Sequence, residues 1–438
     1  MARAKKETAL TPEERLQAAL VPDWEWPYKL PENWCWLKLV ESFDNHTDSK
    51  KKIKQKDYLV KGKLAVVDQG QELIGGYTND VEKSYSGALP IVIFGDHTRC
   101  IKFVDFPFAQ GADGVKVLRP KPFYLPKAFY YALQSVNIPN LGYRRHFPLF
   151  NKFSIPLPPF AEQQRIVDRI ESLFAKLDEA KEKAQAVVDS FETRKAAILH
   201  KAFTGELTAK WREEHGVGME SWEYKTFEAI VENMQNGLAK RKGISGTPYV
   251  VLRLANLTDC GFNTDDLREI LLDEKEQANY ELRPNDVIMI RVNGSKDNVG
   301  KQYLITNQHH WAFCDHIIRI QYSNRLLPQY MIYFSRSKNY RIYVKENIVS
   351  SAGQNTISRK GMVGLIVPTP CLNEQFEIVH ILDDLFSKEQ QSKETAEIVL
   401  NQIDLMKKSI LTCAFRGELG TNDPSEESAV ELLKRTIL

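Results

Sequence analysis

The feature that most constrains this chain is a long segment that occurs twice, at a constant shift of 212 in residue number. Pairing Glu162-Gln163 with Glu374-Gln375 aligns residues 156–207 with 368–419 without a gap, and roughly 20 of about 52 aligned positions are identical. A repeat that keeps its register over such a length indicates the same structure twice. The chain is therefore predicted to consist of two halves.

Each copy is predicted to form one long helix. Prolines hold residues 156–159 and 368–370 in an extended lead-in, so the helices are expected to start near Ala161 and Asn373. Gly205 and Gly417 supply the left-handed residue that ends them. Apolar residues alternate three and four apart, as in a coiled-coil seam. The predicted seam residues are Ile166, Ile170, Leu173, Leu177, Ala184, Val187, Phe191, Ile378, Leu382, Leu385, Ala396, Val399, Ile403, Met406 and Ile410.

About 40 helical residues make a rod of about 60 Å. Because the second helix follows the second lobe, it can pack on the first only by returning antiparallel, which predicts a pseudo-twofold internal repeat around a two-helix spacer. The polar residues Glu389 and Ser392 interrupt the second seam, and polar seam positions usually fix register. The alternative is two independent amphipathic helices, each packed on its own domain.

The segments that flank the first repeat resemble each other weakly, at a local shift of 202. Residues 113–115 align with 315–317, and 125–131 with 327–333. Short strands are expected at 64–67, 90–94, 249–254, 287–292 and 316–320 because apolar runs are broken there by Gly, Asn and Asp. The predicted fold class is therefore α+β, with two mixed α/β lobes and two long antiparallel helices. Different loop lengths on one scaffold are expected to carry two specificities.

Composition limits the function. No apolar run is long enough to span a bilayer and the amino terminus has no apolar signal core, which predicts a cytoplasmic protein with no membrane contact. The net charge of +2 averages about +6 for residues 32–155 and about +4 for 222–366 against mildly acidic helices. Basic lobes suit a polyanion, and the helices suit protein partners. The six cysteines are scattered and are expected to be reduced thiols.

Motifs for catalysis and metal binding are incomplete. Residues 294–302 resemble a phosphate-binding loop but are one residue too long and end in Gln302. Pro158-Pro159-Phe160 resembles part of an amino-methyltransferase motif, with Leu157 at the place of the residue that would hold the amine. His309, His310 and His316 lie near Asp315 in the sequence without a further ligand at metal spacing. We therefore predict no catalytic residues and no metal site.

Taken together, the paired helix starts, the long seams and the paired Gly-Glu-Leu ends resemble the specificity subunit of type I DNA restriction-modification enzymes. Residues 30–34 and Trp222 resemble the starts of target-recognition domains, and residues 205–212 resemble the end of the central conserved region. The second copy departs from the pattern, because Leu372-Asn373 precedes its Glu-Gln and its end lacks the Trp-Arg tail. The order of these duplicated motifs covers nearly the whole chain.

The resemblance implies a noncatalytic subunit that binds double-stranded DNA, two methyltransferase subunits and, in the full complex, motor-nuclease restriction subunits. Each lobe would read one half of a split, asymmetric target, and the spacer would set the gap. S-adenosylmethionine would be held by the methyltransferase partner, with no cofactor in this chain. The implied setting is the prokaryotic cytoplasm. The implied domains are an N-terminal helical flank at 1–31, target-recognition domains at 32–155 and 222–367, conserved spacer helix regions at 156–211 and 368–419, and a short C-terminal helix at 420–438.

A second interpretation comes from a different class: a coiled-coil adaptor whose lobes bind protein or RNA. A third, a self-sufficient methyltransferase or nuclease, conflicts with the incomplete methyl-donor and metal motifs.

Phosphate contact needs cations, and base reading needs forked donors and amides on loops. The lysine run at 50–56 suits phosphates, with a solvated loop as the alternative. Arg144 and Arg145 suit guanine, and the amides of Gln354 and Asn355, at the corresponding place in the second lobe, suit adenine. The candidate DNA contacts are Lys50, Lys51, Lys52, Lys54, Arg144, Arg145, Lys240, Arg241, Lys242, Asn293, Ser295, Lys296, Arg336, Lys338, Gln354 and Asn355.

The two Glu-Gln pairs at the helix starts, Glu162-Gln163 and Glu374-Gln375, have two interpretations. They are expected either to face the methyltransferase partner or to act at the helix N-terminus, where a carboxylate is favoured by the positive end of the helix dipole.

Overall fold

A computed structural model describes residues 11–259 and 261–437 of the chain. The first ten residues of the predicted N-terminal flank, the predicted thiol Cys260 and Leu438 at the end of the C-terminal flank lie outside the described residues. The chain divides into two compact units. The first combines residues 1–184 with 398–438, and the second comprises residues 185–397. Each unit is described by itself.

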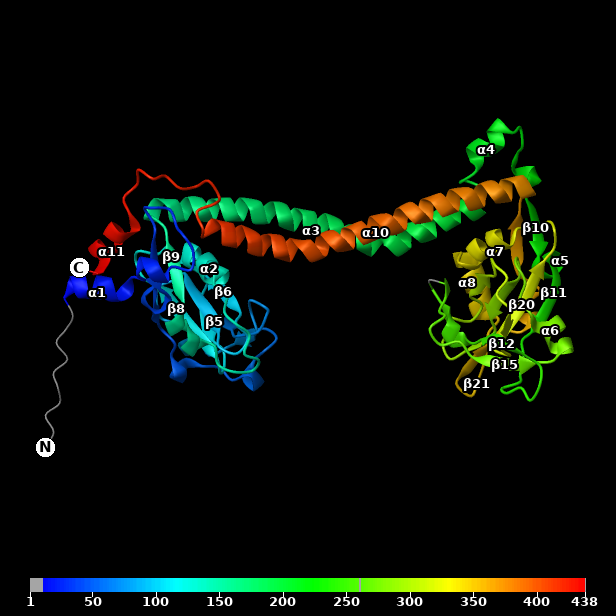
Figure 1. The fold of residues 1–438 in the computed structure, drawn as a ribbon, viewed down its shortest axis with the longest axis horizontal. Coiled ribbons are helices and arrows are strands. Elements are labelled where there is room, and N and C mark those ends of the chain that lie inside the picture. Colours follow the sequence, from blue (N-terminus) through cyan, green and yellow to red (C-terminus); the bar gives the residue numbers. More distant parts are fainter. Residues whose placement is uncertain (1–10, 260, 438) are drawn as a thin grey trace. The chain divides into compact units, whose positions relative to one another are not determined.

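The first lobe contains one four-stranded antiparallel sheet and one three-stranded mixed sheet. A four-stranded antiparallel sheet has the order β2-β8-β5-β6, and a three-stranded sheet has the order β4-β3-β7, in which β3 and β7 are parallel. Helix α2 covers the four-stranded sheet (Figure 1). The elements are β2 Phe43–Asn45, β3 Leu64–Val67, β4 Gly76–Thr78, β5 Ile91–Gly95, β6 Ile101–Val104, β7 Phe108–Gln110, β8 Val115–Pro120 and α2 Pro126–Ser135.

The second lobe repeats this plan. Its four-stranded sheet has the order β11-β20-β16-β18, and its three-stranded sheet has the order β15-β12-β19, again with one parallel pair, β12 and β19. Helix α7 contacts β18, and α8 packs beside α7. The elements are β11 Val231–Asn236, β12 Thr247–Leu252, β15 Glu269–Leu272, β16 Val287–Ile290, β18 Gln302–Leu304, β19 Trp311–Phe313, β20 Ile317–Tyr322, α7 Pro328–Ser335 and α8 Lys338–Glu346.

Smaller elements complete each unit. A two-stranded ribbon joins each lobe to its helix: β1 pairs with β9 in the first unit and β10 with β23 in the second. The second lobe also has a small sheet of order β17-β22-β21. The remaining elements are α1 Pro12–Ala19, β1 Cys35–Lys38, β9 Ser154–Leu157, α4 Ala209–Glu214, β10 Glu223–Thr226, α5 Phe227–Ile230, β13 Leu257–Thr258, β14 Gly261–Phe262, α6 Glu274–Tyr280, β17 Val292–Asn293, β21 Val349–Ser351, β22 Gln354–Thr356, α9 Arg359–Met362, β23 Ile366–Thr369 and α11 Ala429–Ile437.

The repeated segments form the two longest helices, α3 (Phe160–Phe203) and α10 (Leu372–Ala414). In the first unit the start of α3 meets the end of α10, where Lys407 lies 2.5 Å from the Asp178 carboxylate. In the second unit the end of α3 meets the start of α10, where Arg194 binds Glu389 at 2.8 Å. Early residues of one helix contact late residues of the other in both units, so the pairing is antiparallel. The predicted fold class, two α+β lobes with two long packed helices, is confirmed.

The seam residues predicted from heptad spacing are buried or half-buried, except Met406. The side chain of Met406 is 47% exposed, and Lys407 takes the place expected for it. The Lys407 ammonium of α10 lies 5.1 Å from the centre of the Phe174 ring of α3 and pairs with Asp178, also on α3. The aliphatic stem of a lysine can cover an apolar neighbour while its charge reaches an acid.

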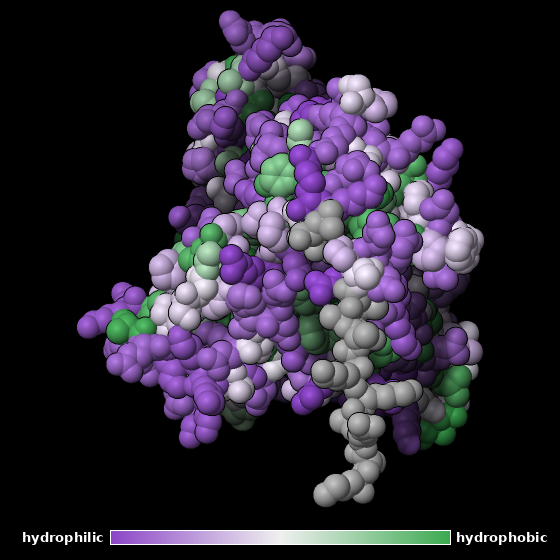
Figure 2. Space-filling view, turned by 90° about the vertical axis from the view of Figure 1, so that its left-hand side faces the viewer, coloured by the Kyte–Doolittle hydropathy of each residue, from purple (hydrophilic) through white to green (hydrophobic). Residues whose placement is uncertain are grey.

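Each lobe shares its core with the helices. In the first unit, Ile166 and Ile170 of α3 and Phe415 beyond α10 join a cluster that includes Trp34 and Leu433 of α11. In the second unit, residues at the end of α3 and the start of α10 join the core beneath α7. None of the described helices is long and apolar enough to cross a membrane, and the face drawn in Figure 2 is mainly hydrophilic, with small separate apolar patches.

Candidate nucleic-acid interface

The loop of the first lobe that contains Arg144 and Arg145, here called the arginine loop, is held by hydrogen bonds at His146, while its two arginines are exposed. His146 is fully buried, and its backbone N–H donates to a carboxylate oxygen of Asp96 at 2.8 Å. The ring Nε2 accepts from the backbone N–H of Leu141 at 3.1 Å, so Nδ1 carries the proton and donates to the Asp96 carbonyl oxygen at 2.9 Å. Arg144 and Arg145, next to this clamp, are both exposed.

Tyr143 extends the same loop. Its side chain is 86% exposed, and its ring stacks on His97 with the ring centres 4.9 Å apart. The loop therefore presents an aromatic surface beside two forked cations, which is the combination that base and backbone contacts use.

The lysine run of the first lobe is anchored rather than free. Ile53 is buried and its N–H donates to the Gln110 carbonyl at 2.9 Å. Lys51 donates to the carbonyl of Ser84 at 3.1 Å. Four lysines line a cleft of about 420 Å³ beside this anchor: Lys52, Lys54, Lys56 and Lys83. Lys50 is exposed at its edge, so the run forms a basic surface of fixed shape.

A chain of short contacts links the lysine cleft to the arginine loop. Lys52 lies 4.0 Å from Asp113, and the Gln69 amide donates to the Asp113 carbonyl at 3.0 Å. The same amide accepts from the N–H of His97 at 3.2 Å. Gly114, at φ +87°, has no room for a Cβ beside Gln69. Two candidate runs that lie nearly 90 residues apart in the sequence are therefore connected through Asp113, Gln69 and His97.

The second lobe has a matching basic cleft. The Arg241 guanidinium binds both carboxylate oxygens of Asp315, at 2.9 and 3.1 Å. Lys240 binds Glu276 at 2.7 Å, and Lys242 is exposed. The cleft has a volume of about 280 Å³, and its cationic and histidine side chains are Lys240, Arg241, Arg253, Arg268 and His316.

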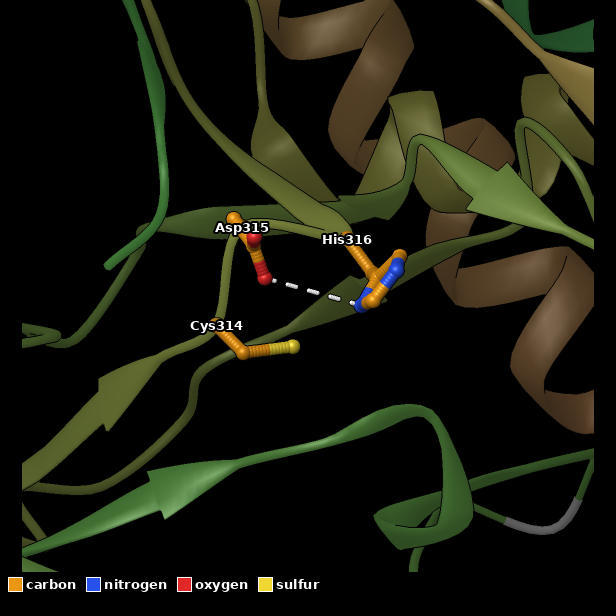
Figure 3. A group of neighbouring side chains, drawn as sticks. All are labelled: Cys314, Asp315 and His316. Atoms are coloured by element: carbon orange, nitrogen blue, oxygen red, sulfur yellow. Dashed lines mark ion pairs between the residues drawn. The ribbon is translucent and has the colours of Figure 1, made fainter. Parts of the chain in front are cut away.

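Cys314, Asp315 and His316 lie together in the turn before β20 (Figure 3), with possible ligand atoms within 4.8 Å of one another. Burial raises the pKa of the Cys314 thiol. Burial also acts to raise the pKa of Asp315, but the hydrogen bonds and charge of Arg241 outweigh it, so this pKa lies below its ordinary value. Arg241 binds both oxygens of the one carboxylate in this group and supplies its counter-charge. His310 instead binds Glu281 at 2.9 Å, and His309 stacks on Trp311.

Two further candidate runs of the second lobe meet in the small sheet β17-β22-β21, where Asn293 lies opposite Asn355. Asn355 is 8% exposed. Its amide oxygen accepts from the Ser350 hydroxyl at 2.7 Å and its amide nitrogen donates to the Gly294 carbonyl at 2.8 Å. The hairpin therefore uses the Asn355 amide internally.

Other side chains remain outward at this sheet. Gln354, Ser295 and Lys296 are exposed, whereas the Asn293 side chain accepts from the N–H of Ser295 at 2.9 Å and shapes the turn. The exposed amide of the hairpin is thus that of Gln354.

The last two candidates belong to another region of the lobe. Arg336 packs on the ring of Tyr333 and lines a cleft of about 380 Å³ beside Glu192 and Lys195 of α3. Lys338 is exposed in the first turn of α8. Neither residue lines the Arg241 cleft.

The candidate DNA-contact loops of the two lobes are hydrogen-bonded to equivalent backbone positions. In the first lobe, the backbone of Asp96, after β5, binds Gly114 and His146. In the second, the backbone of Arg291, after β16, binds His316 and Ile357 in the same way. The arginine loop and the amide hairpin therefore occupy corresponding places on one scaffold, although one is a loop and the other a strand pair.

Sequence reasoning missed the role of the Glu-Gln pairs. All four side chains are fully buried, so the prediction that they face a partner is wrong. They do lie in the first helical turn, as the dipole interpretation expects, but their side chains bind other parts of the lobe. Gln163 accepts from the Leu125 N–H at 2.7 Å, and Gln375 accepts from the Leu327 N–H at 2.9 Å. Each glutamine thereby ties its long helix to the lobe's own helix, α2 or α7.

The glutamates bind the tryptophan that opens each lobe. Glu162 accepts from the Trp34 indole at 2.7 Å and from the Thr421 hydroxyl at 3.1 Å. Glu374 accepts from the Trp222 indole at 2.9 Å and from the Thr208 hydroxyl at 2.7 Å. We call these two groups the glutamate anchors.

Only one anchor holds a cation. Arg212 lies 2.6 Å from Glu374, and both side chains are buried. Near Glu162, Arg165 instead binds Glu426 through two bonds of 2.8 Å. The sequence shows that each half contains one Glu-Gln pair and one tryptophan at the start of its lobe. It gives no spacing pattern that would connect Thr208, Thr421 or Arg212 to these residues.

Comparison with known proteins agrees with this geometry. The family model of the type I restriction modification DNA specificity domain matches residues 31–188. The specificity subunit of the type I restriction enzyme StySPI from Salmonella potsdam is 34% identical over 62% of this chain and 58% of its own length. The EcoKI specificity subunit from Escherichia coli K12 is 30% identical over the same shares. The match spans less than two thirds of these curated relatives.

Solved structures support the fold. The HsdS subunit from Thermoanaerobacter tengcongensis matches with a TM-score of 0.59 at 18% identity, over 90% of this chain and 100% of that one. A chain solved in work on complex assembly and conformational transition of the type I R-M system matches with a TM-score of 0.56 over the same shares, also at 18% identity. The lobes and paired helices thus share the fold of these solved chains. The chain is therefore similar to type I restriction-modification specificity subunits over the matched parts.

Proposed function

We propose that this chain is the noncatalytic DNA-recognition subunit of a type I restriction-modification complex, in which each lobe reads one half of a bipartite, asymmetric target. The observation that carries the proposal is the pair of equivalent faces. Both faces are basic, and in both the candidate loop is hydrogen-bonded to the equivalent backbone position of the shared scaffold. The exposed side chains of the two loops differ in chemistry. Arg144 and Arg145 offer guanidinium groups, whereas Gln354 offers an amide. Guanidinium groups suit guanine and amides suit adenine.

The long helices would set the gap between the half-sites and dock two methyltransferase subunits, to which motor-nuclease restriction subunits add in the full complex. S-adenosylmethionine would be bound by the methyltransferase, which would transfer the methyl group to adenine N6 in each half-site. This chain would then act on double-stranded DNA in the prokaryotic cytoplasm. Exposed residues of α3 and α10, rather than the buried Glu-Gln pairs, remain available for docking.

The test is methylation sequencing of host DNA with and without the gene for this chain. Loss of N6-methyladenine from one split, asymmetric motif is expected when the gene is absent, and its return when the gene is restored. An unchanged pattern beside an active methyltransferase would contradict the proposal and favour a coiled-coil adaptor that binds protein or RNA.

Lengthening both helices is expected to lengthen the gap. Seven residues inserted after Val187 of α3 and seven after Ala396 of α10 add one heptad to each helix, or about 10 Å, which corresponds to about three base pairs. The original target should lose methylation while the same two half-sites, set further apart, gain it. The control carries the insertion in α3 alone, which breaks the pairing register and should methylate neither target. Methylation of the original target by the doubly lengthened chain would refute a spacer role.

A further inference from the structure

Two aliphatic side chains are almost completely exposed. Val60 is 90% exposed and Ile244 is 97% exposed, more than any other large apolar residue that the structure describes. Single apolar residues on a surface are normal and need no explanation. These two are different because they occupy the same place in the two lobes.

The sheet register shows the equivalence. The central strands β3 and β12 each pair with one parallel and one antiparallel neighbour. The first parallel pair is Ala65 with Phe108 in one lobe and Val250 with Trp311 in the other. Counted back from these pairs, Val60 and Ile244 differ by one position. Both therefore lie in the loop that leads into the central strand.

Both loops are pressed against a neighbouring strand. In the first lobe, Leu59 and Tyr77 exchange two backbone hydrogen bonds of 2.8 and 2.9 Å, and a Cβ on Gly62 would lie 2.9 Å from the Thr78 carbonyl oxygen of β4. In the second, a Cβ on Gly243 would lie 2.1 Å from the Leu271 carbonyl oxygen of β15, and Gly246 is as close to Leu272. This close backbone approach leaves the aliphatic side chain facing outward on a shaped loop.

Cationic residues flank both side chains in the sequence. The exposed residues Lys61 and Lys63 follow Val60, and Lys240, Arg241 and Lys242 precede Ile244. Arg241 also connects its loop to Asp315 at the basic cleft of the second lobe. An apolar group set among cations fits a surface that is anionic but carries apolar atoms. The major groove of DNA offers such a surface, because the thymine C5-methyl group projects into it between the phosphates.

We propose that Val60 and Ile244 each contact the C5-methyl group of a thymine in the half-site that their own lobe reads, an inference that rests on the proposed function. Both side chains are short and branched, which suits contact with a projecting methyl group better than insertion between stacked bases. The proposal requires at least one T·A pair in each half-site.

Thymine and uracil differ only in this methyl group, so the test is a double-substitution cycle. The full chain, copurified with its methyltransferase partner, is compared as wild type, Val60→Ser and Ile244→Ser. Serine carries no methyl group, and both positions are exposed, so the fold is not at risk. The first DNA probe is a duplex that contains the motif identified by methylation sequencing. The others are the same duplex with deoxyuridine at each thymine in turn. Dissociation constants are measured at one fixed salt concentration.

For the wild type, one uracil substitution in each half-site is expected to weaken binding about tenfold. Ile244→Ser should bind the thymine duplex about tenfold more weakly and lose nothing further with uracil at its half-site. Val60→Ser should behave likewise at the other half-site. Ile342→Ser, at an exposed isoleucine on α8, serves as the matched control and should leave all constants unchanged.

The proposal is overturned if the losses from the protein and DNA changes multiply independently. It is equally overturned if Val60→Ser and Ile244→Ser bind like the wild type. A wild-type complex that binds the motif and a scrambled duplex equally well would instead show that the proposed function itself fails.

Discussion

Replacing Arg144 and Arg145 together by alanine is expected to abolish recognition of one half-site while leaving the other intact. Both guanidinium groups are exposed on a loop whose base is clamped by His146 and Asp96, so their removal should not disturb the lobe. A bidentate arginine–guanine pair discriminates by about 1–3 kcal/mol. Loss of two such contacts should weaken binding by about 100-fold or more.

The measurement is selection of bound sequences from a random duplex pool by the complex that contains the variant. Base preferences should disappear over one half-site only. Arg15→Ala combined with Lys29→Ala removes the same charge from exposed positions before the first lobe and should preserve both half-sites. Gln354→Ala is the reciprocal variant and should alter the other half-site. An equal loss at both half-sites after the arginine substitutions would rule out that Arg144 and Arg145 read only the half-site of the first lobe.

Replacing Glu374 by glutamine is expected to destabilise the second unit by about 3 kcal/mol or more. The change leaves the buried Arg212 guanidinium without its carboxylate partner at 2.6 Å, and an uncompensated buried charge is costly. The bond from the Trp222 indole can persist because the glutamine oxygen still accepts. The loss therefore reports on the ion pair rather than on the whole anchor.

The equivalent change in the first unit, Glu162→Gln, is expected to alter stability by about 1 kcal/mol or less. Burial raises the pKa of Glu162, against the hydrogen bonds of Trp34 and Thr421 and the charge of Arg165. A carboxyl group with a raised folded-state pKa favours the folded state at pH below that pKa and loses this contribution as the pH rises through it. A neutral amide at this position therefore removes a cost at neutral pH.

Urea unfolding followed by tryptophan fluorescence compares the two variants, and hydrogen exchange in the first turns of α3 and α10 locates the loss. Glu374→Gln should lower the unfolding midpoint and reduce protection at the start of α10. Equal losses in the two variants would show that Arg212 contributes no more than the neutral bonds of the anchor.

Much of the fold follows from local periodicity. Helix α3 starts one residue before the expected Ala161 and α10 one residue before the expected Asn373. Strands were expected at 64–67, 90–94 and 287–292, and the structure has Leu64–Val67, Ile91–Gly95 and Val287–Ile290. Heptad spacing succeeds because a helix must bury one stripe. It misplaces Met406 because the lysine stem of Lys407 can occupy a seam that spacing reserves for apolar side chains.

The candidate contacts were less predictable. A run of lysines has the same sequence pattern whether it forms a solvated loop or is held against the lobe. The burial of Ile53 and the hydrogen bond from Lys51 to Ser84 show that this run is held against the lobe. Asn355 reads as a free amide on a turn, yet Ser350 and Gly294 take both of its polar atoms. Such partners come from residues whose sequence separation carries no pattern.

By itself, the sequence determined the duplication, the two long helices and their antiparallel return, because these depend on period and order along the chain. Only the tertiary structure decided that the Glu-Gln pairs are buried anchors, that one anchor holds Arg212, and that Asp113, Gln69 and His97 connect the lysine run of the first lobe to its arginine loop. The physical reason is the same in each case. A buried carboxylate or amide is stabilised by whichever donors the fold brings within about 3 Å, and for Glu374 these come from Thr208, Arg212 and Trp222, more than 150 residues earlier in the chain.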